Sequence, residues 1–333
     1  MNMRDGLKYE SEKANGFGAL FSLTRINRNK RAQQAAPLRI WKSCHLAHEF
    51  DGRGFKGVHY YFILVIFASL ALFPLIFVFI QSFFSSAELN QNYGDLLGIN
   101  GANTFAMPLI PKRATLNNYA GILVNNPFTL VKFWVSVLLS LSIVAGQVAI
   151  SCLGGYGLAK FNFRSKSIMF FLVVVAMMLP HQVTLVPNYI VLDSLGWIGS
   201  YAALIVPGIF STFGVFLISQ VFASIPNEVI EAAQIDGANQ MSILFKVVIP
   251  YRKSGVISLV ILSFIDNWNM VEQPLVFLKD PLRFPLSIFL SRVNAADPGL
   301  GFASGILAAL PPLLLFLFYM DELASGIEYS NLK

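Results

Sequence analysis

The side chains that could do acid–base or metal chemistry are few in this chain of 333 residues. His45 and His48 have a ligand-like spacing, but no cysteine or carboxylate cluster accompanies them, so no metal site is expected. His181 falls within an apolar segment, where it could relay protons or face other helices at a bend. No Gly-x-x-x-x-Gly-Lys-Ser/Thr phosphate loop occurs, so the chain is not expected to hold ATP itself. The sequence predicts no catalytic residue and no cofactor.

Two carboxylates, Asp266 and Glu272, lie near the apolar segments. A self-sufficient secondary transporter or channel would need such groups along an ion path. They are six residues apart, so on one helix they would project about 120° away from each other. We interpret them as satisfying helix ends or lining a polar cavity. A secondary transporter or channel remains an alternative function, whereas a membrane enzyme lacks any nucleophile–base or metal-ligand cluster.

The composition places the chain in a membrane. Of its residues 55% are hydrophobic and 13% charged, whereas soluble domains carry roughly a quarter charged residues. As a helix, about 20 apolar residues cover the roughly 30 Å hydrocarbon core. We therefore expect an all-α, polytopic membrane protein with six transmembrane helices, the third broken or bent at Pro180. The spans are expected at about 60–82, 133–158, 168–192, 201–221, 255–274 and 301–319.

Positive charge is distributed unevenly between the connecting segments. Taken alternately along six spans, one side carries 18 Lys and Arg residues and the other carries 6. Because basic loops stay in the cytoplasm, both termini are expected there. Residues 1–57 are interpreted as a basic cytoplasmic tail, 58–320 as the membrane domain and 321–333 as a short cytoplasmic tail. No basic stripe interleaves with exposed aromatics, so nucleic-acid binding is not expected.

A compact polar stretch lies between two apolar segments, on the side predicted to be cytoplasmic. Residues 226–236 suit a short helix, and Gly237 stands where the helix must stop in a left-handed turn. A second segment, 240–248, precedes Pro250. Ala232 and Ala233 keep the first helix slim enough to enter a groove. On physical grounds the stretch is either a docking element for a partner or an ordinary loop lying on the membrane.

The sequence from Glu231 to Ala238, followed by Ile249-Pro250, resembles the EAA loop of permease subunits of type I ABC importers. The resemblance is strongest to the MalG-like, binding-protein-dependent class for carbohydrates, and it covers roughly residues 60–320. Supporting matches lie on both flanks: Tyr156, Leu158-Ala159-Lys160-Phe161, Phe163-Arg164, Pro180, Val186-Pro187, Ser224-Ile225-Pro226, Trp268-Asn269 and Pro274. Ser254, Met270 and Glu272 depart from the family's pattern.

The resemblance implies a subunit that forms half of a translocation pathway in the bacterial inner or plasma membrane. It implies three kinds of partner: a second homologous permease, a separate ATP-binding-cassette ATPase dimer, and an extracellular or periplasmic solute-binding protein. The ATPase would dock on the coupling loop, residues 224–250. The coupling residues that the resemblance implies are Glu231, Ala232, Ala233, Asp236, Gly237, Ala238 and Pro250.

The solute that the resemblance implies is a sugar or oligosaccharide, with a non-sugar solute such as glycerol phosphate as the alternative. Sugars are held by hydrogen bonds and aromatic faces, which makes polar and aromatic residues near the third and fifth spans candidates. The candidates are Asn188, Asn267, Trp268, Asn269 and Gln273. The same residues could instead stabilise helix packing beside the pathway.

Overall fold

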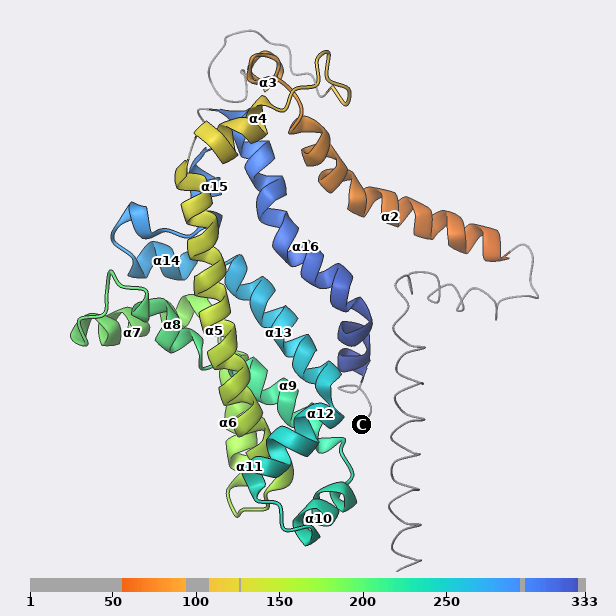
Figure 1. Ribbon diagram of the computed structural model, residues 1–333, viewed down its shortest axis with the longest axis vertical. Helices are drawn as coiled ribbons and strands as arrows, with labels where there is room; N and C mark the ends of the chain where they lie inside the picture. Colours follow the sequence, from red (N-terminus) through yellow and green to blue (C-terminus); the bar gives the residue numbers. More distant parts are fainter. Residues whose placement is uncertain (1–55, 94–107, 126, 294–296, 329–333) are drawn as a thin grey trace, which may run out of the picture. The chain divides into compact units, whose positions relative to one another are not determined.

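The structure, a computed structural model, describes residues 56–93, 108–125, 127–293 and 297–328. These residues form helices and connections with no β-strand among them (Figure 1). The chain divides into two compact units, Met1–Leu72 and Phe73–Lys333. Most of the predicted basic tail, residues 1–55, lies outside the described residues.

The first unit contributes the beginning of α2 (Lys56–Gln81). Large apolar side chains from Tyr61 to Leu72 are largely exposed on all sides of this helix. A helix that is apolar all round is suited to lipid rather than to water. Residues Tyr61–Gln81, which begin in this unit and continue into the second, are long and apolar enough to cross a membrane.

The second unit is organised along α5 (Pro127–Lys160), a helix of 34 residues and roughly 50 Å at 1.5 Å per residue. Before it come α3 (Ser86–Tyr93), α4 (Asn117–Ala120) and the π-helical segment Gly121–Asn125. Gly155 lets α9 (Thr212–Ala223) approach closely, because an added Cβ would lie 2.7 Å from Ile218 and 2.9 Å from the Ser219 backbone nitrogen. At Gly157, by contrast, an added Cβ would have only Phe161 within 4 Å.

The third apolar segment is broken as predicted. It consists of α6 (Lys166–Met177) and α7 (His181–Ser194), which are bent by 100°. Pro180 caps α7 in an extended conformation (φ −63°, ψ 138°), which a residue inside a continuing helix could not adopt. The next segment is also divided, into α8 (Ala202–Gly208) and α9.

The fifth apolar segment ends earlier than predicted. Helix α13 (Lys253–Trp268) stops at Trp268, and α14 (Glu272–Phe277) begins after a break. Asp266 and Glu272 therefore stand on different helices, and the 120° separation predicted for one continuous helix is wrong. The segment after α14 then holds the 3₁₀ turn Pro281–Arg283 and α15 (Leu286–Val293).

The last helix, α16 (Pro298–Glu328), extends beyond the predicted sixth span. Its backbone is non-helical at Tyr319 (φ −123°, ψ 22°), which marks a kink. Residues 321–328, predicted as part of a short tail, continue as helix beyond this kink. The Ser258 hydroxyl donates to the Glu322 carbonyl at 3.1 Å, which holds this end of α16 against α13.

Four of the described helices or helix pairs are long and apolar enough to cross a membrane, and six segments qualify if each strongly bent pair is one span. Two side-chain amides inside this bundle bind backbone carbonyls. Gln147 donates to the Gly208 carbonyl at 2.7 Å, and Asn267 donates to the Ser263 carbonyl at 2.7 Å. These bonds satisfy polar atoms that would be costly in hydrocarbon.

Candidate functional site

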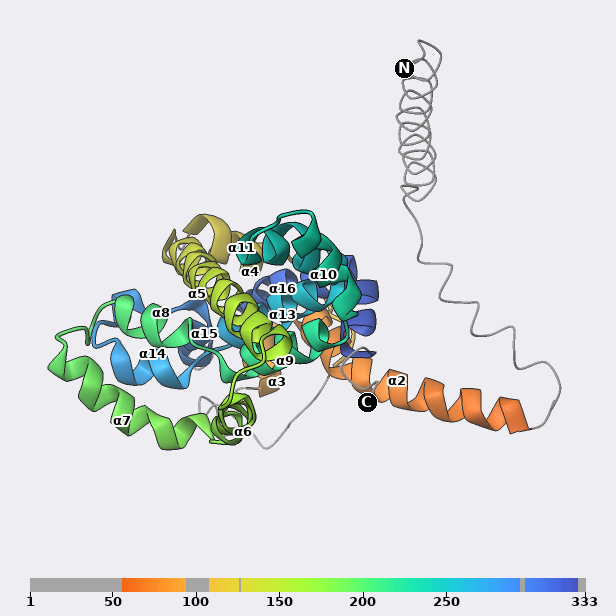
Figure 2. The ribbon, with the colours of Figure 1, turned by 90° about the horizontal axis from the view of Figure 1, so that it is seen from below.

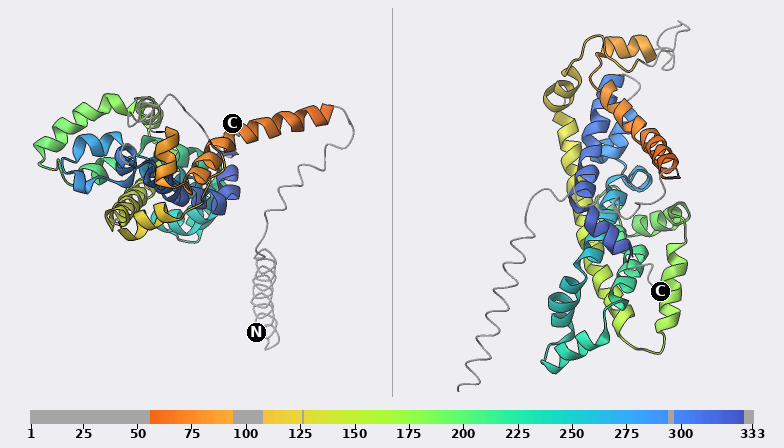
Figure 3. Two further views of the ribbon diagram at one scale, coloured as in Figure 1. Left: turned by 90° about the horizontal axis from the view of Figure 1, so that it is seen from above. Right: turned by 90° about the vertical axis from the view of Figure 1, so that its right-hand side faces the viewer.

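The coupling loop, residues 224–250, folds into short helices at one end of α5. They are α10 (Asn227–Ile235), α11 (Gln240–Ile243), the π-helical segment Leu244–Val248 and α12 (Ile249–Tyr251). Figure 3 shows α10 to α12 at the end of α5 opposite to α3 and α4. In Figure 2, α10 and α11 lie on one side of α5, with α6 and α7 on the other. The loop is thus a folded helix–turn–helix.

Helix α10 ends in a Schellman motif centred on Gly237. The Ala238 N–H donates to the Ala233 carbonyl at 3.0 Å and the Gly237 N–H to the Gln234 carbonyl at 2.9 Å. Gly237 has φ +80°, as predicted, where a side chain would strain the backbone. Asn239 then caps α11, its side chain accepting from the Ser242 N–H at 2.7 Å. Both sides of the turn are therefore fixed by hydrogen bonds.

The second part of the loop changes its helical pitch before Pro250. The Ile249 N–H donates to the Leu244 carbonyl, five residues back, instead of four. Proline lacks an N–H and its ring displaces the carbonyl of residue i−4, so a π-turn here absorbs the distortion. The sequence predicts the second segment as 240–248, ended by Pro250, whereas the helical residues continue through Pro250 to Tyr251 and the break falls at Arg252 (φ −119°, ψ 40°).

The coupling loop has one buried face and one exposed face. Ile230, Ile243, Leu244 and Val248 are at most 7% exposed and pack in one cluster with Tyr156 of α5 and with α9 and α13. Ala233 and Ala238 are partly buried against the same cluster. The opposite face carries exposed residues, several of them large and apolar: Glu231, Ala232, Ile235, Asp236, Gly237, Met241, Phe245 and Pro250.

Comparison with a family model decides what kind of protein carries this loop. Residues 147–329, more than half of the chain, match the model described as "Binding-protein-dependent transport system inner membrane component". The chain belongs to this family. It is a multi-pass inner-membrane component of a transport system, hereafter the permease, and not a member of a catalytic family. The matched range contains the whole coupling loop.

Characterised relatives cover most of the permease. It is 28% identical over 271 residues to the arabinooligosaccharides transport system permease protein AraQ of Halalkalibacterium halodurans, covering 80% of this chain and 92% of the relative. It is 30% identical over 201 residues to the sn-glycerol-3-phosphate transport system permease protein UgpE of Pectobacterium atrosepticum, covering 59% and 72%.

A solved structure supports the fold. A chain from a bacterial ABC transporter involved in the import of the acidic polysaccharide alginate matches with a TM-score of 0.68 at 21% identity, covering 82% of this chain and 98% of that one. At this identity the match speaks for the fold alone. The all-α permease architecture predicted from the sequence is confirmed.

The residues predicted to line the substrate pathway separate into two groups. Trp268 is 4% exposed, donates from Nε1 to the Ala308 carbonyl at 2.9 Å and contacts the rings of Phe133 and Phe264. Asn267 is 9% exposed and binds the Ser263 carbonyl. Both side chains thus pack inside this chain. The others reach its surface to differing degrees, with Asn188 and Asn269 exposed and Gln273 partly exposed.

The structure adds one polar contact that the sequence did not indicate. The Gln182 amide nitrogen donates to both carboxylate oxygens of Glu272, at 2.9 and 3.1 Å. Gln182 stands in the first turn of α7 and Glu272 begins α14, so the contact joins the ends of two broken helices. The sequence offered two signals near this contact, Pro180 and the departure from the family pattern at Glu272. They are 92 residues apart, so neither indicated that Gln182 and Glu272 would meet.

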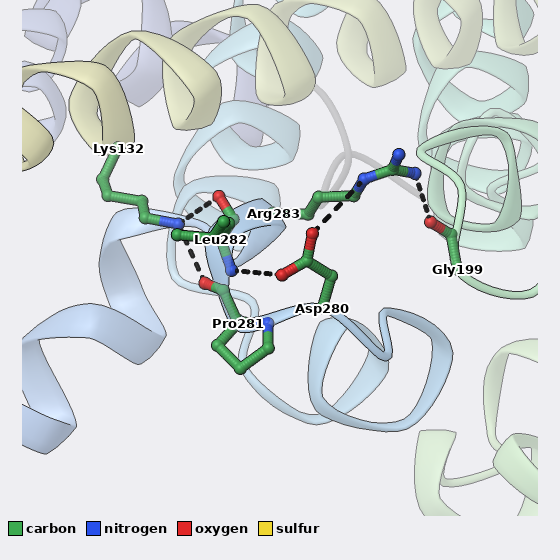
Figure 4. Close-up of polar contacts among 6 residues, drawn as sticks. All are labelled: Lys132, Gly199, Asp280, Pro281, Leu282 and Arg283. Atoms are coloured by element: carbon green, nitrogen blue, oxygen red, sulfur yellow. Dashed lines mark hydrogen bonds and ion pairs between the residues drawn. The ribbon is translucent and has the colours of Figure 1, made fainter.

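At the other end of α5, a second set of polar contacts fixes the segment between α14 and α15 (Figure 4). Lys132, 5% exposed, donates to the Pro281 carbonyl at 2.9 Å and to the Leu282 carbonyl. Asp280 accepts from the Leu282 N–H at 2.8 Å and pairs with Arg283 at 3.9 Å. Arg283 in turn donates to the Gly199 carbonyl at 2.5 Å. This network ties α5 to two separate loops, one holding Gly199 and the other Asp280 to Arg283.

Proposed function

We propose that the permease forms half of the translocation pathway for a sugar or oligosaccharide and is driven by a separate ATPase that docks on the coupling loop. The observation that carries the proposal is the division of this loop into a face buried against α5, α9 and α13 and an exposed face. A partner bound to the exposed face would move helices that share its core. An ordinary loop lying on the membrane would not need such a folded inner face.

The exposed face suits insertion into a groove. Ile235 is 86% exposed, Phe245 59% and Met241 58%, and large apolar side chains of this kind usually mark binding surfaces. Ala232 beside them leaves α10 narrow. The Schellman motif at Gly237 keeps the angle between α10 and α11 fixed, so that a push on one helix is transmitted to the other.

The orientation rests on charge. With 18 Lys and Arg residues on the coupling-loop side and 6 on the other, the positive-inside rule predicts a cytoplasmic location for this loop and both termini. ATP is available on that side. A second homologous permease would complete the pathway, and an extracellular or periplasmic solute-binding protein would deliver the solute on the side of Lys132 and α15.

A neutral solute is favoured over a phosphate. Glu272 is exposed where α7 and α14 meet, and its partner Gln182 is uncharged. A carboxylate repels anions, while it accepts hydrogen bonds from sugar hydroxyls.

Glycerol phosphate remains the second candidate, because one of the similar permeases is named for the transport of sn-glycerol 3-phosphate. Excess sn-glycerol 3-phosphate should leave uptake of labelled arabinotriose unchanged; full competition would favour the second candidate.

The docking claim is tested by Gly237→Asp in the full assembly. At φ +80° an aspartate strains the turn by roughly 1 kcal/mol and adds charge to the exposed face. We expect the ATPase to be lost from the purified complex, or its stimulation by loaded binding protein to disappear. Gly196→Asp is the matched control, since Gly196 also has positive φ (+71°) and open space around it but lies outside the coupling loop.

Normal transport by the Gly237→Asp variant would refute the docking role. ATP-independent uptake by the wild-type permease would favour the secondary-transporter alternative instead.

A further inference from the structure

Residues 224–227 join α9 to α10 and include Asn227, the first residue of α10. Ser224 caps the end of α9, and Pro226 precedes α10 in an extended conformation (φ −58°, ψ 140°). The last carbonyls of a helix have no partner within it. Pro226 cannot donate an N–H to them. Locally, the Phe222 carbonyl accepts from the Ile225 N–H at 3.1 Å and the Val221 carbonyl from the Ser224 hydroxyl at 2.7 Å. The Ser224 and Ile225 carbonyls, which follow α9, are bound by donors on other elements.

Two cationic side chains from different helices supply those donors. Lys160, the last residue of α5, places Nζ 2.5 Å from the Ile225 carbonyl and 3.1 Å from Asn227 Oδ1. Arg252, at the break between α12 and α13, donates from Nη2 to the Ser224 carbonyl at 3.2 Å. Cations are favourable at a helix C-terminus. The connection is thus held from two sides.

A third contact fastens the other half of the coupling loop to the same turn of α5. The Tyr156 hydroxyl donates to Gln240 Oε1 at 2.7 Å. Tyr156 is 4% exposed within the cluster that holds Ile230 and Ile243. Gln240 begins α11, so α5 binds both α11 and the residues preceding α10 within its last five residues.

We propose that Lys160 and Arg252 are positioning residues for coupling: they hold the 224–227 connection so that displacement of α10 moves α5 and α13. This inference rests on the proposed function. Without these bonds, a docked ATPase would bend the connection, and the motion would not reach the bundle. Hydrogen bonds from charged donors are suited to this role, since they are shorter and stronger than neutral ones.

The test is Lys160→Met in the full complex of both permeases, ATPase dimer and binding protein, reconstituted in proteoliposomes. Labelled arabinotriose taken up per ATP hydrolysed is the readout, alongside the ratio of ATPase to permease after purification. We expect normal ATPase content and about tenfold less solute per ATP, the factor that losing one charged hydrogen bond makes in an equilibrium. Lys160→Arg, which keeps a long cationic donor, should restore the ratio to within about twofold.

Lys253→Met is the matched control, because Lys253 is an exposed cation next to Arg252, outside the 224–227 connection. An unchanged solute-to-ATP ratio in Lys160→Met, or an equal loss in Lys253→Met, would overturn the inference. If Lys160→Met does not assemble, Arg252→Met removes the second charged donor, the one that binds the Ser224 carbonyl, and a wild-type ratio there would overturn the inference. Failure of the proposed function would look different, because the wild-type permease itself would then lack the ATPase.

Discussion

The two ends of α5 form the same kind of hydrogen bond, but we assign the two bonds different roles. Each carries a lysine whose ammonium group binds backbone carbonyls: Lys132 at Pro281 and Leu282, and Lys160 at Ile225. Lys132 is 5% exposed, and the segment it binds is further fixed by Asp280 and Arg283. Lys160 is partly exposed, and the connection that it binds leads into α10, which carries part of the exposed face of the coupling loop. Lys132 thus binds a segment that other contacts also fix, whereas Lys160 binds the start of α10, which we propose a partner moves.

Burial decides what each lysine contributes. A buried ammonium that is removed leaves carbonyl oxygens without donors and without water, so its loss falls on stability. A partly exposed one can be replaced by water at lower cost, so its loss falls on how motion is transmitted. The comparison therefore predicts that substitutions at the Lys132 end of α5 lower stability and that substitutions at the Lys160 end impair coupling.

The largest stability effect is expected from Lys132→Met. Methionine keeps much of the apolar stem but leaves the Pro281 and Leu282 carbonyls without their donor, at a cost of about 1–3 kcal/mol. Thermal unfolding of the purified permease in detergent should show a lower Tm, while solute transported per ATP stays normal in the folded fraction. Lys279→Met, an exposed cation of the same segment after α14, is the control. A normal Tm together with less solute transported per ATP in Lys132→Met would contradict the proposed difference between Lys132 and Lys160.

A smaller effect is expected from Trp268→Phe, which tests whether this residue packs or binds solute. Phenylalanine keeps an aromatic ring against Phe133 and Phe264 and loses the bond to the Ala308 carbonyl, which costs about 1 kcal/mol. We expect a modest fall in Tm and an unchanged KM for uptake. A large rise in KM at unchanged Tm would place Trp268 in the pathway instead.

Local sequence signals predicted much of this structure. Long apolar runs located the helices, Pro180 located the break between α6 and α7, and Gly237 located the left-handed turn. Each of these depends on a few consecutive residues whose backbone preferences are strong.

Contacts between distant residues were not predictable in the same way. The sequence around Trp268 does not indicate the bond from its indole nitrogen to the Ala308 carbonyl, 40 residues away. The bonds of Lys132 and Lys160 join residues 149 and 65 positions apart. The roles proposed for the coupling residues and for Asn188, Asn269 and Gln273 stay predictions.

Photo-cross-linking at the two ends of α5 tests the central claim most directly. Ile235, 86% exposed on α10, and Leu282, 68% exposed in the segment after α14, would each be replaced by p-benzoylphenylalanine in the transporting complex. After irradiation, mass spectrometry would identify the adducts. We predict an ATPase adduct at Ile235 and none at Leu282. An actively transporting complex with no ATPase adduct at Ile235, or with one at Leu282, would contradict the account.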